Sequence, residues 1–459
     1  MEVLESRLTA VRRCCAALPD TRTGDNWQYT MADIGLAAFA VFFAQSPSFL
    51  AHKRHLVEWH GHSNAQTLFG MAKIPTDNHI RARLDPITPD HFTPLFAEIL
   101  TALEQSGGLT AFRRLDEHVL IALDGTEYHR STEVQCRHCA TRTRTGQPTE
   151  YFHTVLCATL VAPGHDRVVP LAPEFMVPQD GHAKQDCESR AARRWLARHG
   201  AVYARLKPVY LGDDLYACQP LCEAGLATGG HFLCVCKPDS HPTIQEYLTG
   251  IDLLEQVARV KRGRERVTHR YRWLCAVPLR GDDTALNVNW FSIEIVNPKG
   301  EVTYRNSFIT DLPVDASTVA ELSACGRARW KIENESFNVL KTKGYHLEHN
   351  FGHGTATSLG RARHPQPDRL CAPHRLRPRR RRLAPGPRHA RAAHPLLPQS
   401  AGADRLSGLP VLDRTPGNAR LRAATATPAR LTDRPASQAR RSIRSSAQSR
   451  IENCCDRTD

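Results

Sequence analysis

This sequence lacks long apolar runs, regular cysteine spacing and the usual nucleotide-binding loops. The longest apolar run, residues 34–44, has 11 residues, whereas a membrane-spanning helix needs about 20. The first residues do not form a basic start followed by an apolar stretch, so the sequence predicts no signal peptide. There is no P-loop, no G-x-G-x-x-G loop and no G-x-S-x-G elbow. We therefore expect a cytoplasmic protein that is neither membrane-bound, nor ATP- or NAD-dependent, nor an α/β-hydrolase.

The last part of the chain lacks bulky side chains. Residues 361–459 contain no Phe, Trp, Tyr or Lys, but 22 Arg and 12 Pro. Such a composition does not bury enough apolar surface to offset the entropy of ordering, which predicts disorder. The abrupt change resembles GC-rich DNA translated out of frame, and we hypothesise a frameshift near Gly354. The alternative is an Arg-rich tail that binds nucleic acid through phosphates.

The positive charge is confined to the same tail. The chain has a formal net charge of +14, yet 22 of its 61 Lys and Arg lie in residues 361–459, against only 7 of its 47 acidic residues. The preceding 360 residues are close to neutral. Net charge therefore gives no support to nucleic-acid binding by the body of the protein, although a local basic patch is compatible with it.

The first part of the body, residues 1–112, is expected to be helical. Apolar residues recur at helical spacing in residues 31–50 and 91–103. Between them a helix is predicted to begin near Pro75, with Thr76 or Asp77 as its cap, and to carry Arg81 and Arg83. This helix is a candidate for a DNA groove, and the alternative is an ordinary solvated helix face.

From residue 118 onward the pattern is that of an α/β layer. Strands are predicted over residues 118–123, 151–161, 167–177, 205–212 and 230–236, with several alternating segments over residues 267–309. Helices are predicted over residues 188–199, 215–226 and 318–341. Strands mixed with crossover helices indicate an α/β fold with a β-rich insertion.

Three acidic residues occupy positions from which metal ligands can project. Asp124 and Asp213 each follow a predicted apolar strand, and Glu333 lies on the last predicted helix. Carboxylate oxygens suit Mg²⁺, and two such ions about 4 Å apart can cut a phosphodiester. The chain has 47 acidic residues, so spacing alone is weak evidence.

The residues around these acids resemble a known family. Arg329-Trp330-Lys331-Ile332-Glu333, with Lys341 further on, resembles the Tyr-Arg-Glu-Lys signature of bacterial insertion-sequence transposases of the DDE class. Residues 121–126 (IALDGT) resemble the first acid motif and residues 211–216 (LGDDLY) the second, with Asp213 rather than Asp214 as the ligand. The resemblance covers roughly residues 30–353.

The resemblance implies an enzyme of cut-and-paste DNA transposition. Residues 1–112 would bind DNA, residues 113–353 would form a ribonuclease H-like catalytic core with a β-rich insertion at about 262–315, and residues 354–459 would be the tail. Asp124, Asp213 and Glu333 would hold Mg²⁺ or Mn²⁺, and Arg329 and Lys341 would contact phosphate. The implied partners are double-stranded DNA and a second copy of the chain, and no membrane.

Two departures from the signature are visible. Gly326 stands where the family has Tyr, and Lys341 comes one residue late, because Leu340 occupies the expected position. If the tail is out of frame, the helix expected beyond His353 is also missing, which predicts an inactive product. The alternatives are a related nuclease that cuts without joining strands and a non-catalytic DNA-binding remnant. Trp330 is a candidate for base stacking, or else a core residue.

A separate metal site is predicted at Cys136 and Cys139. Their spacing is that of half a zinc site, and His153 and Cys187 are the candidate further donors, with His138 and His182 as other options. The alternative is two ordinary reduced cysteines in a loop. The other cysteines are irregularly spaced among 15 in all, so we expect reduced thiols rather than a disulfide framework.

Overall fold

The computed structural model describes residues 2–24, 26–58, 68–71, 73–136, 138–177, 186–263 and 265–348. The described residues all belong to one compact unit. The predicted tail at 354–459, the hypothesised frameshift near Gly354 and the candidate donor His182 lie outside the described residues. Within them, no helix combines the length and apolar character needed to cross a membrane.

Helices make up the first part of the described chain, as predicted. They are α1 (Glu2–Ala16), α2 (Met31–Phe43), α3 (Phe49–Glu58), α5 (Asp77–Leu84), α6 (Thr93–Gln105) and the 3₁₀ turns η1 (Pro89–Phe92) and η2 (Gly108–Phe112). Thr30 and Asp33 form a reciprocal capping box at the start of α2, and Thr76 caps α5 as predicted. Apolar side chains of α1, α2, α3 and α5, including Ile34, share one core, whereas Leu100 of α6 packs in a core with residues of the sheet.

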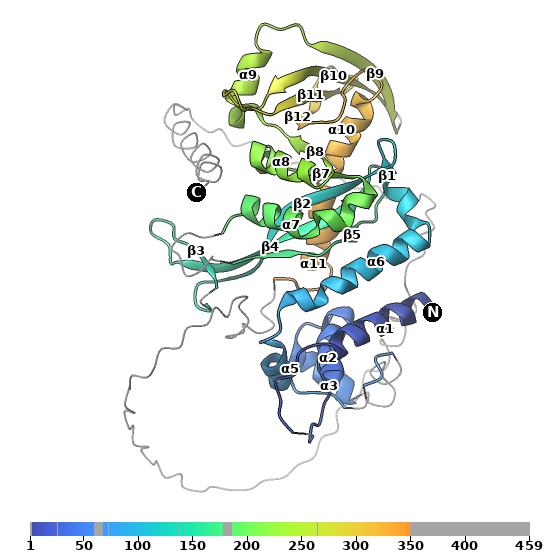
Figure 1. The fold of residues 1–459 in the computed structure, drawn as a ribbon, viewed down its shortest axis with the longest axis vertical. Coiled ribbons are helices and arrows are strands. Elements are labelled where there is room, and N and C mark those ends of the chain that lie inside the picture. Colours follow the sequence, from blue (N-terminus) through green and yellow to red (C-terminus); the bar gives the residue numbers. More distant parts are fainter. Residues whose placement is uncertain are drawn as a thin grey trace, which may run out of the picture. The chain divides into compact units, whose positions relative to one another are not determined.

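A mixed twelve-stranded sheet forms the centre of the rest (Figure 1), which confirms the predicted α/β class. The first strands are β1 (Arg113–Arg114), β2 (His118–Ser131), β3 (Ala140–Arg142), β4 (Glu150–Val161), β5 (Val169–Pro170), β6 (Glu174–Met176), β7 (Pro208–Gly212) and β8 (His231–Val235). The main order is β3-β4-β2-β7-β8-β12-β11-β10-β9. β2, β7 and β8 run parallel, and the other pairs are antiparallel.

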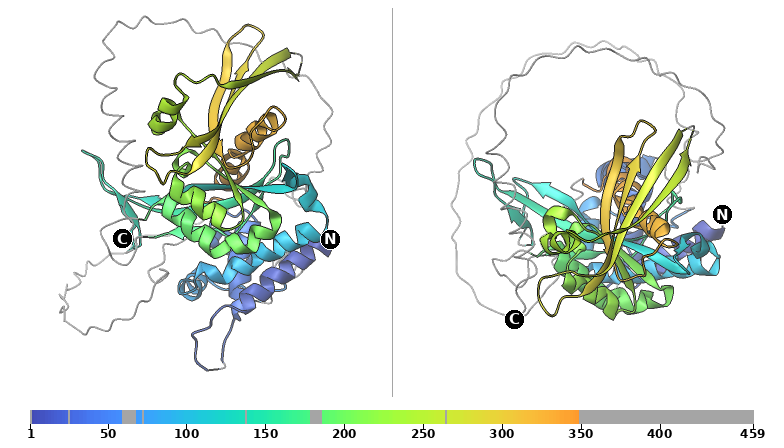
Figure 2. Two further views of the ribbon diagram at one scale, coloured as in Figure 1. Left: turned by 45° about the horizontal axis from the view of Figure 1, so that its top comes forward. Right: turned by 90° about the horizontal axis from the view of Figure 1, so that it is seen from above.

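Helices cover both faces of this sheet (Figure 2). Alternate residues of β2 divide between two cores: Ile121 packs in the same core as Trp195 of α7 (Glu188–Tyr203), and Leu120 in the same core as Leu322 of α10 (Val319–Ala328). This alternation follows from the pleat of a strand. The first core also includes side chains of α8 (Gln219–Ala227), Leu221 among them. The short elements η3 (Ala204–Leu206), η4 (Asp214–Tyr216), η5 (Pro238–Ser240) and α9 (Pro242–Leu248) lie between these strands and helices in the chain.

The β-rich insertion continues the same sheet. Its strands are β9 (Leu254–Arg262), β10 (Glu265–Pro278), β11 (Asn287–Val296) and β12 (Val302–Thr310). β12 pairs with β8, so that the insertion extends the sheet edge. β9 begins at Leu254 and pairs with β10, so these paired strands begin eight residues before the predicted start of the insertion at about residue 262.

Two other predicted elements differ from the structure. Residues 167–177 were predicted as one strand, but they form only β5 and β6, which each pair briefly with β4. Residues 318–341 were predicted as one regular helix. They form α10, a π-helix at Ile332–Phe337 (η6) and α11 (Asn338–Thr342). A π-helical turn holds one residue more than an α-helical turn, so it changes which residues share a face.

Candidate active site

The parallel pairing of β2 and β7 brings two of the predicted acids to neighbouring positions. Ala122 pairs with Leu211, so that Asp124 and Asp213 each come two residues beyond this pair. Neighbouring strands lie about 4.8 Å apart. Both acids therefore lie at neighbouring positions, although 88 other residues separate them in the chain. Asp213 directly follows β7 as predicted, whereas Asp124 lies within β2 and not at its end, because β2 continues to Ser131 in pairing with β4.

The helical segment after the insertion adds Arg329 and Glu333 to the same place. One guanidinium nitrogen of Arg329 lies 3.3 Å from Asp124 Oδ2, and the other donates to Glu333 Oε1 at 2.7 Å. The side chains of Asp124 and Arg329 are 15% and 16% exposed, whereas that of Glu333 is 48% exposed. Arg329 thus bridges one largely buried carboxylate and one exposed carboxylate.

A fourth carboxyl group, Glu188, joins these acids and was missed by the sequence analysis. Glu188 lies in the first turn of α7, and its Oε1 accepts hydrogen bonds from Gly125 N at 3.0 Å and Tyr216 Oη at 2.7 Å. A Cβ added at Gly125 would lie 2.7 Å from Glu188 Oε2. Glycine next to Asp124 therefore lets Glu188 approach the strand. An acid in the first turn of a helix is common, because it suits the helix dipole, so the sequence carried no special signal.

Burial and mutual repulsion perturb these groups. Burial first, and then the charge of Glu188, raise the pKa of Asp124 to about 7, although Arg329 opposes the rise. Burial is also the main reason that the pKa of Glu188 is raised. Burial disfavours the charge on Arg329, but the Glu333 hydrogen bond and the charges of nearby acids raise its pKa overall. The site therefore carries more carboxyl groups than one guanidinium neutralises.

Asp213 and its neighbour Asp214 have different surroundings. Asp213 Oδ1 accepts from Leu215 N at 2.8 Å and caps η4. Asp214 Oδ1 accepts from Lys237 N at 2.6 Å and lies 3.3 Å from His241 Nε2. Asp214 is thus engaged by the loop after β8, and Asp213 contributes to the electrostatics of Asp124. This division agrees with the choice of Asp213 as the candidate ligand.

The remaining predicted DNA contacts lie at several places. Trp330 is 55% exposed, so it is not a core residue. Lys341 Nζ pairs with Glu348 at 2.8 Å. Arg81 and Arg83 lie on α5, among the N-terminal helices rather than on the sheet, and Arg81 pairs with Asp77 at 3.8 Å. Only Arg329 is joined directly to the acids.

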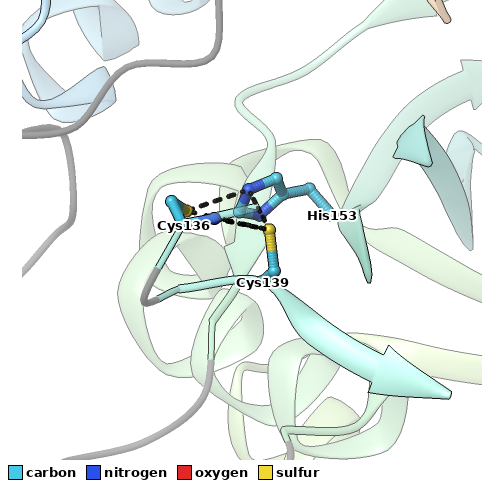
Figure 3. Close-up of side chains that lie close together, drawn as sticks. All are labelled: Cys136, Cys139 and His153. Atoms are coloured by element: carbon cyan, nitrogen blue, oxygen red, sulfur yellow. Dashed lines mark hydrogen bonds between the residues drawn. The ribbon is translucent and has the colours of Figure 1, made fainter. Parts of the chain in front are cut away.

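A second group of potential ligands lies further along the β2–β4 pair. Among the described residues, only Cys136, Cys139 and His153 bring three metal-binding atoms within 4.8 Å of one another (Figure 3). This group can hold a metal ion. Cys187, grouped with them from the sequence, is not a member and forms the N-cap of α7. The carboxylates around Asp124 do not meet this spacing.

Comparison with models of known protein families and with curated proteins gives no match.

Proposed function

We propose that this chain is a DDE-class transposase that cuts DNA at the ends of an insertion sequence and joins them to a target. The observation that carries the proposal is the Arg329 bridge between Asp124 and Glu333. The sequence motifs nominate these three residues independently of any geometry. Arg329 contacts both Asp124 and Glu333, and Asp213 lies on the neighbouring chain segment after β7, which supports a shared catalytic role.

The order of elements supports a ribonuclease H-like core. In the proposed family a β-rich insertion precedes the final helical segment that carries the catalytic Glu. Here β9–β12 come directly before α10 and the π-helix with Glu333. Asp124 lies within β2 and Asp213 directly follows the parallel strand β7, with α7 between the two acids in sequence.

The chemistry of the donor atoms, rather than their present spacing, suits hard divalent cations such as Mg²⁺ or Mn²⁺. Asp124, Asp213 and Glu333 offer only oxygen atoms, and the pKa of Asp124 is raised first by burial and then by the charge of Glu188, against the opposing charge of Arg329. Two bound cations would supply activation of the attacking oxygen and stabilisation of the leaving oxygen. Glu188 accepts hydrogen bonds from Gly125 and Tyr216. We therefore assign Glu188 to positioning the part of β2 that carries Asp124.

Arg329 has a further part in this proposal. Its guanidinium is held by two carboxylates, yet it remains next to the solvent-accessible Glu333. A guanidinium matches phosphate oxygens as well as carboxylate oxygens. Cations on the acids would compete for the same carboxylates, which would leave Arg329 to bind a DNA phosphate beside the cut. Exposed Trp330, the next residue, can then stack on a displaced base.

The π-helix offers a physical account of the late Lys341. Lys341 follows Glu333 by eight residues, one more than in the family signature. The turn at Ile332–Phe337 contains the extra residue, because each π turn is one residue longer than an α turn. Lys341 is thereby turned toward the helix face that Leu340 would occupy in a regular α-helix, which supports its role as a phosphate contact.

Gly326 accounts for the other departure from the signature. A Cβ at this position would lie 2.6 Å from the ring of Phe308, which is fully buried. A tyrosine cannot occupy this place without displacing Phe308 of β12. Glycine at position 326 therefore allows α10 to pack closely on Phe308 of β12.

The test is DNA cleavage with duplexes that carry the inverted repeats flanking the gene. The full chain with Mg²⁺ is expected to nick and then join these ends, and Asp124→Asn and Glu333→Gln are expected to abolish both steps while retaining DNA binding. Glu335→Gln, an exposed acid on the same π-helix, is the matched control and should stay active.

Three other outcomes would reject or change the proposed function. Cleavage that survives in both Asp124→Asn and Glu333→Gln would reject the site. Cleavage without strand joining would identify the related nuclease instead. End-specific binding without any Mg²⁺-dependent cleavage would identify a non-catalytic remnant.

A further inference from the structure

We propose that Cys136, Cys139 and His153 bind one Zn²⁺ ion in a structural site that is separate from the carboxylates. The three donors come from a loop after β2 and from β4 (Figure 3). Cys139 and His153 are buried, at 7% and 9% exposed. The site does not depend on the transposase proposal.

The distances between the donors match those of a tetrahedral ion. With Zn–S near 2.3 Å and Zn–N near 2.0–2.1 Å, tetrahedral angles put two sulfurs about 3.8 Å apart and sulfur and nitrogen about 3.6 Å apart. Here the two Sγ atoms are 3.8 Å apart, and His153 Nε2 lies 3.5 Å from Cys136 Sγ and 3.4 Å from Cys139 Sγ. A disulfide would need the sulfurs about 2.05 Å apart.

Backbone amides donate hydrogen bonds to both sulfurs. Cys136 N donates to Cys139 Sγ at 3.3 Å, and His138 N donates to Cys136 Sγ at 3.4 Å. Such outer hydrogen bonds orient metal ligands and tune their basicity. Two thiolates would neutralise the charge of one Zn²⁺ ion, and soft sulfur donors select Zn²⁺ over Mg²⁺.

His153 is held in place before any ion binds. It pairs with His129 across β4 and β2, and the ring of Tyr128 stacks on it with centroids 5.7 Å apart and planes 16° apart. The register shift between Glu127 and His129 marks a β-bulge, which turns side chains at such sites. Within the part of the chain that the structure describes, the group has three ligands, and Cys187 is not one of them.

The ion would fasten the Cys136–Cys139 loop to β4. His129 lies five residues beyond Asp124 on β2, which is about 16 Å along a strand. At this distance Zn²⁺ would stabilise the contact between the Cys136–Cys139 loop and β4, and it would take no part in chemistry at the carboxylates.

The test is metal binding by the reduced full chain. We expect one equivalent of Co²⁺ to give sulfur-to-cobalt charge-transfer absorption that Zn²⁺ abolishes and millimolar Mg²⁺ does not. Cys139→Ser should weaken Zn²⁺ binding by at least about 100-fold, the upper end of what loss of an outer-shell partner costs. Cys275→Ser removes an exposed thiol outside the group and should leave binding unchanged, as should Asp124→Asn.

Zinc X-ray absorption on the unmutated chain keeps the test decisive if Cys139→Ser does not fold. We expect a shell with two sulfurs and one imidazole nitrogen. Failure to take up one equivalent of metal, a zinc shell without sulfur, or equal affinity in Cys139→Ser and the unmutated chain would overturn the proposal.

Discussion

At the scale of single residues, the charge of Asp124 dominates the behaviour of the candidate site. Its carboxyl group is held beside Glu188, Asp213 and Glu333, and Arg329 is the only cation bonded to it among the described residues. Burial strengthens each of these interactions, because the dielectric response of the surroundings falls. Folding therefore favours a proton on this residue when no divalent cation is bound.

The first prediction concerns stability against pH. Because folding raises the pKa of Asp124 from 3.8 to about 7, its contribution to stability is complete below pH 4 and is lost as pH rises through 7. In metal-free buffer at pH 8, Asp124→Asn should raise the free energy of unfolding by up to roughly 4 kcal/mol. Urea unfolding at pH 4 and pH 8 measures this gain.

The exposed Asp252 supplies the control for this prediction. Asp252→Asn should change the free energy of unfolding by less than about 0.5 kcal/mol at either pH. A gain in Asp124→Asn that is the same at both pH values would contradict the assigned cause.

The candidate site was partly predictable at this scale. Asp124, Asp213, Glu333 and Arg329 stand in recognisable motifs, and the structure brings them together. Glu188 was not predictable, because its role depends on Gly125 leaving room across 63 positions of sequence. Local patterns do not record such contacts.

At the scale of elements, the π-helix is the feature with the most consequences. It lies between Glu333 and Lys341, and it fixes which face of the helical segment each side chain occupies. Lys341→Ala should therefore lower the affinity for element-end DNA. Lys343 lies two residues further on and is exposed, and Lys343→Ala should lower this affinity much less. Equilibrium binding at two salt concentrations measures both affinities.

Lys341→Ala should also reduce the slope of log affinity against log salt concentration by about one, because one phosphate contact is lost. Equal effects of the two substitutions would show that the π-helix does not select Lys341.

The packing of α10 on β12 gives another prediction. Gly326→Ala should lower the free energy of unfolding by about 1–3 kcal/mol, because its Cβ would press on the Phe308 ring. This loss is expected even though alanine favours helices over glycine by about 1 kcal/mol. Thermal or urea unfolding provides the measurement.

Gly281 is a suitable comparison, since a Cβ there meets nothing closer than Thr243 Oγ1 at 3.9 Å. Gly281→Ala should be nearly neutral. A Gly326→Ala variant as stable as Gly281→Ala would mean that Phe308 has room to move.

Most elements could be predicted from periodicity and caps, and the failures have physical reasons. The strand at β4 and the helix at α7 are long and strongly patterned, so local sequence identifies them. β5 and β6 are short because Pro170 ends β5 and Pro173 lies between the two strands, and a proline has no N–H to donate to a strand ladder. A π turn uses the same residue types as an α-helix, so composition does not reveal the one at Ile332–Phe337.

At the scale of the whole molecule, the order of strands was not predictable. Sequence patterns indicated an α/β layer with an insertion, but pairing of β2 with β7 and of β8 with β12 depends on contacts distant in the chain. The acids became one site only through this topology.

Binding of Mg²⁺ should therefore stabilise the whole fold. A ligand at 100 times its dissociation constant contributes about 2.7 kcal/mol, which calorimetry would record as a higher melting temperature. The increase should be larger at pH 8 than at pH 6, because a proton on Asp124 competes with the cation. Asp213→Asn should remove most of it, and a melting temperature unaffected by Mg²⁺ would contradict a cation site at the acids.

The pairing of β12 with β8 has a consequence for how the molecule opens. Phe308, Ile309 and Thr310 lie opposite Val235, Cys234 and Leu233 in the antiparallel pair. The inserted strands therefore belong to the same sheet as β8, the strand next to β7. We expect the amides of β8 and β12 to exchange with solvent deuterium together, as one cooperative unfolding unit. Mass spectrometry of exchange would detect this as matched protection on both strands. Much faster exchange of β12 alone would instead identify an insertion that opens as a separate flap.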